Sequence, residues 1–285
     1  MRHGEAAIGY RAGVVTLAAL HVYPVKSCRG LATAAARLMD AGLEHDREWM
    51  IVTPGGRFLT QREEPRLATV EVALGEGALT LSAAGAGSVA VPLGPPAGTP
   101  VEVTVWDDRC RALDQGEDVA SWLGDLLGQP LRLVRFDPAH RRESDRAWTG
   151  GAEAWTRFSD GFALLAISTA SLADLNARLP RPLPQDRFRP NLWLDGLPPY
   201  GEDALQDLVA GAVRLRRVKP CTRCIITTTD QATGARDGEE PIRTLKGYRW
   251  DAALRGVAFG QNLIVAGGHG EWLRVGMELG QEPPH

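Results

Sequence analysis

The chain has 285 residues, of which 44% are hydrophobic and 24% are charged, and its net charge is −3. This length predicts two domains or one large barrel, and the composition is that of a globular protein with a sizeable core. The near-neutral charge gives no reason to expect a nucleic acid or an acidic membrane as partner.

The N-terminal segment carries no sign of a secretory signal or a membrane span. Glu5 and Arg11 stand where a signal would have its apolar core, so residues 1–13 are interpreted as a ragged terminus. The longest mostly apolar run, residues 14–25, contains His21 and is shorter than the roughly 20 residues that a membrane helix needs. Four cysteines are too few for a disulfide framework in this chain. We therefore expect a cytoplasmic protein with reduced thiols and no membrane partner.

The first 115 residues are predicted to be mostly β. Short segments of β-branched or alternating apolar residues are separated by turn residues such as Pro54-Gly-Gly. The predicted strands cover residues 15–23, 49–53, 68–74, 79–81, 89–91 and 101–106. The segment 92–100 is predicted to be a loop, because its prolines cannot donate to a sheet. Residues 15–115 are accordingly assigned to a first domain.

The remaining residues, 116–285, are assigned to a second domain. Helical spacing of apolar residues predicts a helix over 117–127, and a second helix is expected to begin at Ser168 or Ser171 and to end before Pro180. Residues 138–156 are polar and are predicted to be a long loop. The predicted strands cover residues 131–136, 161–167, 191–194, 212–218, 224–229 and 263–265. The whole pattern predicts an α+β protein, mainly β and barrel-like, with a few peripheral helices.

The sharpest local feature is the segment Cys221-Thr-Arg-Cys224. A structural zinc site needs about four ligands, and no second cysteine pair or histidine pair stands at a suitable spacing. A thioredoxin-like redox pair would precede a helix, because the helix dipole lowers a thiol pKa, whereas a strand is predicted at 224–229. On this motif alone, two buried and inert cysteines are an ordinary alternative.

Positive charge surrounds this cysteine pair. The basic residues are Arg216, Arg217, Lys219 and Arg223. They would favour a thiolate and a nearby anionic ligand. A soft thiolate in a basic setting suits a transition metal carried on a phosphorylated cofactor. A run of charge is also common on a solvated face, so both interpretations stay open at this point.

Six segments read together narrow the interpretation. In chain order they are Tyr23-Pro-Val-Lys-Ser-Cys-Arg-Gly30, Asp46-Arg-Glu-Trp49 with Phe58-Leu-Thr-Gln-Arg62 and Pro65, Phe188-Arg-Pro-Asn191, Pro220-Cys-Thr-Arg-Cys224, Glu240-Pro-Ile-Arg-Thr-Leu245, and Phe259-Gly-Gln-Asn262. This order resembles that of MOSC proteins. It is most similar to the branch with an N-terminal MOSC β-barrel domain, which includes the mitochondrial amidoxime-reducing component and its bacterial relatives.

The resemblance implies a MOSC-type β-barrel and a molybdenum–molybdopterin cofactor. In that family the second cysteine of the Cys-x-x-Cys-like segment ligates molybdenum, which corresponds to Cys224 as catalytic metal ligand and leaves Cys221 without an assigned role. The residues that the resemblance places around the phosphate and pterin are Lys26, Ser27, Arg47, Arg189, Asn191, Thr222 and Arg223. The chemistry agrees, because Arg presents a planar fork to phosphate and Asn can donate and accept along a pterin edge.

Two positions depart from the family pattern. Relatives carry small polar residues where this chain has Asp160-Gly161-Phe162, so backbone contacts from Gly161 and Phe162 are expected. Asn262, which stands where some relatives have Tyr, is also expected among the cofactor-binding residues. Each residue taken singly has an ordinary alternative, such as a surface ion pair, core packing or a cap. The ordered set favours the cofactor site.

The resemblance further implies an oxidoreductase that reduces N-hydroxylated compounds. The cofactor would remove the oxygen, while the protein supplies orientation, a positive frame and a tuned thiolate. Protons could come from Asp160 or from solvent. The chain ends at His285 without the cysteine-rich extension of an iron–sulfur domain, so an external electron-transfer protein is expected, either ferredoxin-like or a haem protein with a reductase. A membrane anchor like that of the mitochondrial relatives is not expected either.

Two alternatives to a reductase stay open. The first is a module that binds or carries the cofactor, or relays sulfur through a cysteine persulfide. The cofactor sulfurase that gave the family its name has a large pyridoxal-phosphate domain, which this chain lacks, and this weakens the sulfur-relay alternative. The second is a β-barrel for another ligand, in which Cys224 is buried and inert.

Overall fold

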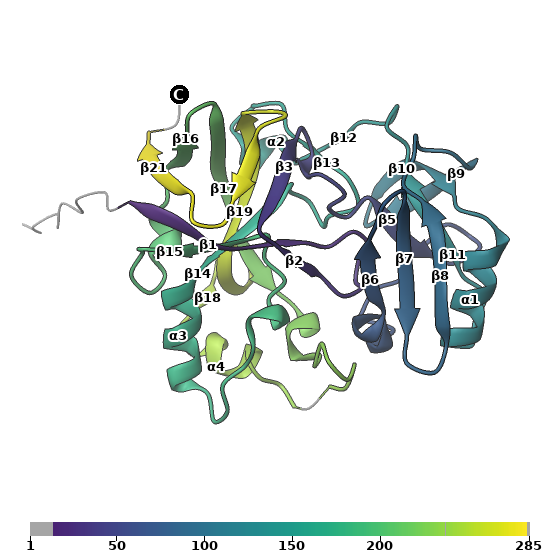
Figure 1. Cartoon of the computed structure of the whole chain (residues 1–285). Helices are drawn as coiled ribbons and strands as arrows, with labels where there is room; N and C mark the ends of the chain where they lie inside the picture. The colour runs from purple at the N-terminus through teal and green to yellow at the C-terminus, as the bar shows by residue number, and fades with distance from the viewer. Residues whose placement is uncertain (1–13, 237, 284–285) are drawn as a thin grey trace, which may run out of the picture.

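The computed structural model describes residues 14–236 and 238–283. Figure 1 shows a barrel on one side and a smaller unit of sheets on the other. The segment interpreted as a ragged terminus, residues 1–13, lies outside the described residues. No helix among the residues described is long and apolar enough to cross a membrane.

The larger unit is a closed barrel of seven strands. Its strands follow one another in the order β14, β15, β1, β21, β16, β17 and β19, and β19 pairs with β14 to close the ring. Their bounds are β1 (Val15–Val22), β14 (Leu164–Ser168), β15 (Leu192–Asp195), β16 (Asp207–Ala210), β17 (Val213–Arg223), β19 (Gly256–Gly267) and β21 (Glu278–Glu282). The short strands β2 (Leu31–Thr33) and β18 (Trp250–Asp251) pair with β1 and β19. The predicted mainly β, barrel-like architecture is confirmed.

Aliphatic side chains fill the barrel, as β1 illustrates. Val15 and Leu17 are buried, and after an irregularity between Leu17 and Ala19 the buried positions become Leu20 and Val22. A bulge shifts the alternation of a strand by one residue in this way. The strand therefore keeps one face toward the core along its whole length.

A helix makes the crossing between β14 and β15, which are parallel. Helix α3 (Thr169–Arg178) begins after Ser168, whose hydroxyl accepts a hydrogen bond from the Ser171 backbone nitrogen at 3.0 Å. Ser168 is thus the N-cap of the predicted helix. The short helix α4 (Ile242–Lys246) packs against α3 and β19.

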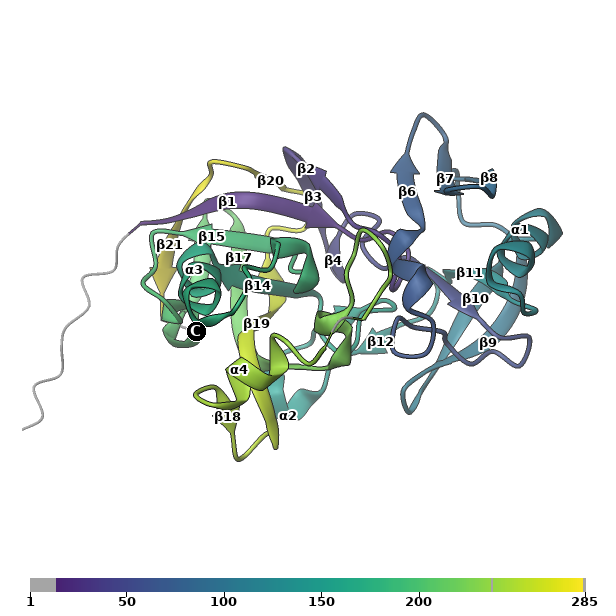
Figure 2. The same ribbon diagram turned by 90° about the horizontal axis from the view of Figure 1, so that it is seen from below.

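The smaller unit contains two sheets. One has the order β5, β11, β10, β9 and the other the order β6, β7, β8. The bounds are β5 (Trp49–Val52), β6 (Glu71–Leu74), β7 (Ala78–Ala83), β8 (Gly87–Pro92), β9 (Thr99–Val105), β10 (Asp108–Asp114) and β11 (Arg132–Phe136). Helix α1 (Glu117–Leu127) contacts β8 and β11, and Figures 1 and 2 both show it on the side away from the barrel. One buried cluster, which includes Trp49, Leu123 and Leu133, joins the helix to the strands.

The strand pairing divides the chain differently from the boundary placed near residue 115. Residues 15–22 belong to the barrel, whereas α1 and β11, which follow residue 115, pack on the smaller unit. A small sheet of β4 (Gly42–Leu43), β3 (Ala35–Met39) and β20 (Trp272–Arg274) also pairs an early segment with a late one. Pairing between distant segments leaves no local mark in the sequence.

The predicted strand at 224–229 is wrong. β17 ends just before Cys224, and the 3-10 helix η4 (Ile225–Thr228) follows. The hydroxyl of Thr227 donates to the carbonyl of Cys224 at 2.9 Å. Thr227 and Thr228, which helped to suggest a strand, therefore stabilise a tight turn through their side-chain hydroxyls.

Other differences are smaller. The first part of the predicted strand 68–74 is the 3-10 helix η1 (Pro65–Thr69). The predicted loop 138–156 contains β12 (Arg142–Glu143), α2 (Arg146–Thr149) and β13 (Trp155–Thr156). Two further 3-10 helices are η2 (Gln185–Arg187) and η3 (Gly201–Ala204).

Candidate functional site

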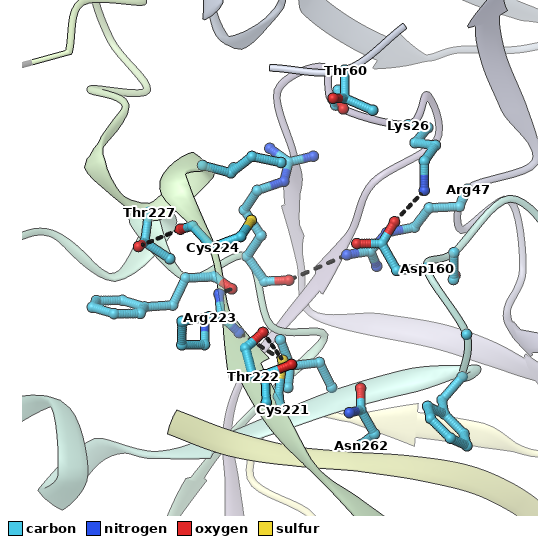
Figure 3. A pocket seen from close by; sticks show the side chains of 18 of the residues that line it. Lys26, Arg47, Thr60, Asp160, Cys221, Thr222, Arg223, Cys224, Thr227 and Asn262 are labelled. Atoms are coloured by element: carbon cyan, nitrogen blue, oxygen red, sulfur yellow. Dashed lines mark hydrogen bonds and ion pairs between the residues drawn. The ribbon is translucent and has the colours of Figure 1, made fainter. Parts of the chain in front are cut away.

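One pocket collects residues that lie far apart in the sequence, and Figure 3 shows it from close by. It has a volume of about 160 Å³ and lies where the end of β17 meets the loops before β14 and β15 and segments from the first 62 residues. Every site residue predicted from the sequence lines it: Lys26, Ser27, Arg47, Gly161, Phe162, Arg189, Asn191, Thr222, Arg223, Cys224 and Asn262. The fold thus brings the whole predicted set together.

Lys26 is buried in this pocket and pairs with Asp160. The Nζ of Lys26 donates to Asp160 Oδ1 at 2.6 Å and to the Phe158 carbonyl at 2.7 Å, while Arg62 approaches Asp160 Oδ2 at 3.4 Å. The side chain of Asp160 is 57% exposed; the surrounding protein opposes its charge, but Lys26 and Arg62 hold the pKa of this carboxyl well below its ordinary value. Burial lowers the pKa of Lys26, and the carboxylate of Asp160 opposes that shift. Asp160 is therefore ionised at neutral pH and anchors two cations.

Ser27, Arg47, Arg189 and Asn191 form what we call the arginine wall. The guanidinium carbons of Arg47 and Arg189 lie 4.2 and 4.4 Å from the centroid of the Tyr23 ring, so one aromatic ring supports both cations. Gly30 leaves room for this ring, because a Cβ at residue 30 would lie 2.3 Å from it. The motif from Tyr23 to Gly30 therefore supplies the aromatic ring that supports the arginine wall and the space for that ring.

Three members of the arginine wall have a left-handed backbone. The φ angle is +69° at Ser27, +45° at Arg47 and +54° at Arg189. Such conformations cost about 1–3 kcal/mol each for residues other than glycine and persist only where the surroundings enforce them. Strain of this kind concentrates at binding sites, so its presence at three residues of one pocket supports a functional role.

Asn191 is nearly fully buried, and the protein occupies most of its amide. Its Oδ1 accepts hydrogen bonds from the Leu165 backbone nitrogen at 3.2 Å and from Arg47 at 3.1 Å. Its Nδ2 donates to the His21 carbonyl at 3.1 Å. These bonds tie β14 and β1 to the start of β15. One N–H of the amide is left for a ligand, which is less than the donor and acceptor pair expected at a pterin edge.

The cysteine wall, which we define as residues Cys221 to Thr227, lies where β17 ends. Both of its cysteines are reduced and partly exposed. Arg223 donates to the sulfur of Cys221 at 3.0 Å and to the Phe188 carbonyl at 2.6 Å. Within the described residues, no hydrogen bond is made to the sulfur of Cys224. The thiol of Cys224 is therefore free to meet a ligand.

The two cysteines are held apart by the backbone. Cys221 lies in β17, which continues to Arg223, and Cys224 is also extended, with φ −124° and ψ 179°. Three extended residues span about 10 Å, whereas a disulfide needs Cα atoms within about 7 Å. This spacing disfavours the redox-pair alternative. The reason is the extended backbone between the two cysteines, and not the strand that was wrongly predicted at 224–229.

Two guanidinium groups of the pocket keep N–H groups without a partner among the described residues. These are Nη1 of Arg62 and Nε of Arg223, both buried and both from side chains that line the pocket. An unpaired buried donor costs about 1–3 kcal/mol, so such groups are expected to meet a ligand. Together with the other cations, they suit an anionic group such as a phosphate.

Several lining residues stand outside the set predicted to bind the cofactor, although sequence reasoning had named Asp160 as a proton source and Cys221 without a role. They are Thr60, Arg62, Ser159, Asp160, Leu164, Leu165, Phe188, Cys221, Ile226 and Thr227. Arg62 and Phe188 stand in two of the six motifs, which was the available signal. No group of three or more His, Cys, Asp or Glu side chains that could hold a metal occurs among the described residues. A metal bound at Cys224 would thus take most of its ligands from a cofactor.

The chain matches two family models. These are the MOSC N-terminal beta barrel domain over residues 14–130 and the MOSC domain over residues 153–279. It is 39% identical over 244 residues to mitochondrial amidoxime-reducing component 1 of Mus musculus and 38% identical to that of Homo sapiens. Each match covers 83% of this chain and 72% of the relative. The crystal structure of YiiM from Geobacillus stearothermophilus covers 66% of this chain and 72% of its own, with 16% identity and a TM-score of 0.32, which is too distant to support an inference.

Proposed function

Because this chain belongs to the family of MOSC proteins with an N-terminal MOSC β-barrel domain, we propose that it reduces N-hydroxylated compounds at a molybdenum–molybdopterin cofactor. Relatives named for amidoxime reduction match most of the chain and support this class of reaction. The observation that carries the proposal is the convergence on one pocket of the free Cys224 thiol and five cationic side chains. The cations are Lys26, Arg47, Arg62, Arg189 and Arg223.

The residues present fit such a cofactor. A thiolate is a soft ligand of the kind that suits a transition metal, and Cys224 offers one. The unpartnered N–H groups of Arg62 and Arg223 offer donors to a phosphate. When bound, the cofactor supplies a two-electron centre that can accept oxygen from an N–O bond.

The role of the protein would be to hold and orient. The hydrogen bond from Thr227 to the Cys224 carbonyl fixes the backbone from which the thiol projects. The stacking of Arg47 and Arg189 on Tyr23 holds two cations in place before any ligand arrives. Such preorganisation lowers the cost of ordering side chains on binding.

Asp160 would have an electrostatic role. It is ionised at neutral pH because, although the surrounding protein opposes its charge, Lys26 and Arg62 hold its pKa well below the ordinary value. A carboxylate without a proton cannot donate one, so we assign proton delivery to solvent. Asp160 would then position Lys26 and Arg62 and balance part of their charge.

Electrons would come from a separate protein, either ferredoxin-like or a haem protein with its reductase, and the substrate would be a small N-hydroxylated molecule. A cytoplasmic location stays a prediction from the sequence. The alternative function is a module that binds or carries the cofactor without reducing a substrate.

One experiment tests the proposal. The protein is purified from a host that makes the cofactor, its molybdenum and pterin contents are measured, and benzamidoxime reduction is assayed with dithionite-reduced viologen. We expect molybdenum and pterin in equal amounts together with turnover. Bound molybdenum without turnover of any N-hydroxylated compound would favour the carrier, and the absence of both molybdenum and pterin would refute both functions.

A further inference from the structure

Trp106 stands in an unusual conformation at the tip of the hairpin of β9 and β10. Val105 pairs with Asp108, so the loop consists of Trp106 and Asp107. The φ angle is +56° at Trp106, and Asp107 is not among the residues with positive φ. A positive φ at the first loop residue alone matches a type II′ turn, whose first position ordinarily holds glycine. The hairpin thus carries a large ring, 47% exposed, at a backbone position that favours glycine.

The ring of Trp106 contacts Arg62, which lines the pocket, and Phe58, which is not among the lining residues. The guanidinium carbon of Arg62, a pocket residue, lies 4.6 Å from the ring centroid. The ring of Phe58 meets Trp106 edge to face at 5.1 Å, and the ammonium of Lys26 lies 5.6 Å from the centroid of Phe58. One side chain therefore separates Trp106 from Asp160, which Arg62 and Lys26 both contact.

Buried Arg142 fixes the hairpin tip to the same part of the pocket. Its Nε donates to Asp108 at 2.8 Å, directly beyond the two-residue loop. Its Nη1 donates to the carbonyls of Arg157 and Ser159 at 2.8 and 2.5 Å, and its Nη2 donates to that of Asp160 at 3.3 Å. The hairpin and the segment that carries Asp160 are thus clamped together by one guanidinium.

An exposed ring at this place is better suited to a small molecule than to a protein. A stable protein interface buries about 800 Å² on each partner, whereas Trp106 is one exposed apolar side chain among charged neighbours. The other large exposed apolar residues of the described ranges are Val14, Ile225, Trp250, Trp272 and Val275; of these, Ile225 follows Cys224 at the border of the same pocket. An aromatic group can stack on the free part of an indole ring, which Arg62 and Phe58 hold in position.

We propose that Trp106 forms a subsite for the aromatic body of an N-hydroxylated substrate, while the N-hydroxyl group enters the pocket beside Cys224. This inference rests on the proposed function, because it assigns to Trp106 the selection among substrates at the same site. It predicts a preference for aromatic over small aliphatic N-hydroxylated compounds.

The test compares Trp106→Gly, Trp106→Phe and the wild type in the cofactor-loaded protein, with reduced viologen as electron donor. Trp106→Gly removes the ring and leaves a residue that a type II′ turn favours, so the hairpin should stay intact. Trp272→Ala removes a ring of similar exposure, 45%, from β20 and serves as control. For benzamidoxime, we expect Trp106→Gly to raise KM by about threefold to tenfold with kcat unchanged, and Trp106→Phe to restore most of the loss. For acetamidoxime, no variant should change either constant.

Calorimetric titration of benzamidoxime and acetamidoxime into the wild type and Trp106→Gly gives a second measurement that needs no turnover. Weaker binding of benzamidoxime alone supports the subsite even if the wild type reduces neither compound, a result that would refute the proposed function. Equal losses for both compounds, or no change, would overturn the subsite. A defect seen only with a protein electron donor would also overturn it and would assign Trp106 to donor docking.

Discussion

The arginine wall and the cysteine wall border the same pocket, yet they differ in how far the protein has already used their polar groups. In the arginine wall, the amide of Asn191 and the guanidinium of Arg189 bond to carbonyls and neighbouring side chains. In the cysteine wall, the Cys224 sulfur accepts no hydrogen bond within the described residues, and Nε of Arg223 has no partner there. The polar groups of the arginine wall are therefore largely bonded within the protein. In the cysteine wall, the Cys224 thiol and Nε of Arg223 remain available to a ligand.

This difference implies that substitutions in the two walls have different consequences. A residue of the arginine wall holds the fold of the pocket, so its loss should lower the free energy of unfolding. In the cysteine wall, the free thiol of Cys224 meets the ligand, so the loss of this thiol should reduce binding and leave the free energy of unfolding nearly unchanged. The predictions that follow test this separation.

The largest effect is expected for Cys224→Ser. A serine hydroxyl stays protonated and is a poor ligand for a metal that prefers sulfur, so we expect the bound molybdenum to fall by more than about tenfold. Metal analysis of protein purified from a cofactor-producing host measures the loss. The urea midpoint of the metal-free protein should be unchanged, and a large shift in that midpoint would contradict the separation of the two walls.

The next effect is expected for Arg47→Ala in the arginine wall. Arg47 pairs at 2.7 Å with Asp46, which is 1% exposed, and its removal takes away the cation in direct contact with that buried carboxylate. Breaking a buried pair in this way costs about 3–5 kcal/mol. Urea unfolding of the metal-free protein measures it.

Arg57→Ala is the matched control for this prediction. Arg57 also pairs with a carboxylate, Glu63 at 2.8 Å, but about half of each side chain is exposed. An exposed pair of this kind contributes about 0–1 kcal/mol. Equal destabilisation by Arg47→Ala and Arg57→Ala would show that the arginine wall is not a structural support.

A smaller effect concerns Glu48, which follows Arg47 in the chain. Burial opposes its charge, but a hydrogen bond from His45 and the charges of Arg157 and Arg135 lower its pKa to about 2. Because this pKa lies below the ordinary value, the carboxylate stabilises the fold above the unfolded pKa of 4.5, and the stabilisation disappears as the pH falls toward 2. Glu48→Gln should therefore destabilise less at pH 3 than at pH 7, by about 2 kcal/mol. A difference that does not depend on pH would contradict this account.

The sequence predicted the members of both walls better than their surroundings. Arg47, Arg189 and Cys224 were predicted as site residues, and they line the pocket, because ordered motifs identify positions without knowledge of the fold. The same motifs do not reveal that Asn191 is committed to backbone groups, because its partners come from distant strands. Asp160 looked like a possible proton donor, since the charges that keep it ionised, Lys26 and Arg62, meet it only in three dimensions.

For the fold as well, features determined by one local segment were predicted, and features that depend on contacts in three dimensions were missed. Helix α1 was predicted with its observed bounds, because apolar spacing within one segment determines it. The strand predicted at 224–229 failed because the Thr227 hydroxyl donates to the carbonyl of Cys224, three residues earlier, and stabilises a tight turn. Strands β10 and β16 were not predicted, since β10 carries many polar residues, β16 has only four residues, and both owe their structure to pairing with neighbours.

The smallest effect is expected for Cys221→Ser. Cys221 accepts a hydrogen bond from Arg223 at 3.0 Å, and a serine hydroxyl at the same place can accept it too. The strand geometry separates Cys221 from Cys224, so Cys221 has no disulfide to lose. We expect molybdenum content and benzamidoxime turnover to change by less than about twofold, because one accepted hydrogen bond replaces another. The reverse pattern, with loss in Cys221→Ser and retention in Cys224→Ser, would move the metal ligand to Cys221 and make the free thiol at the end of β17 a bystander.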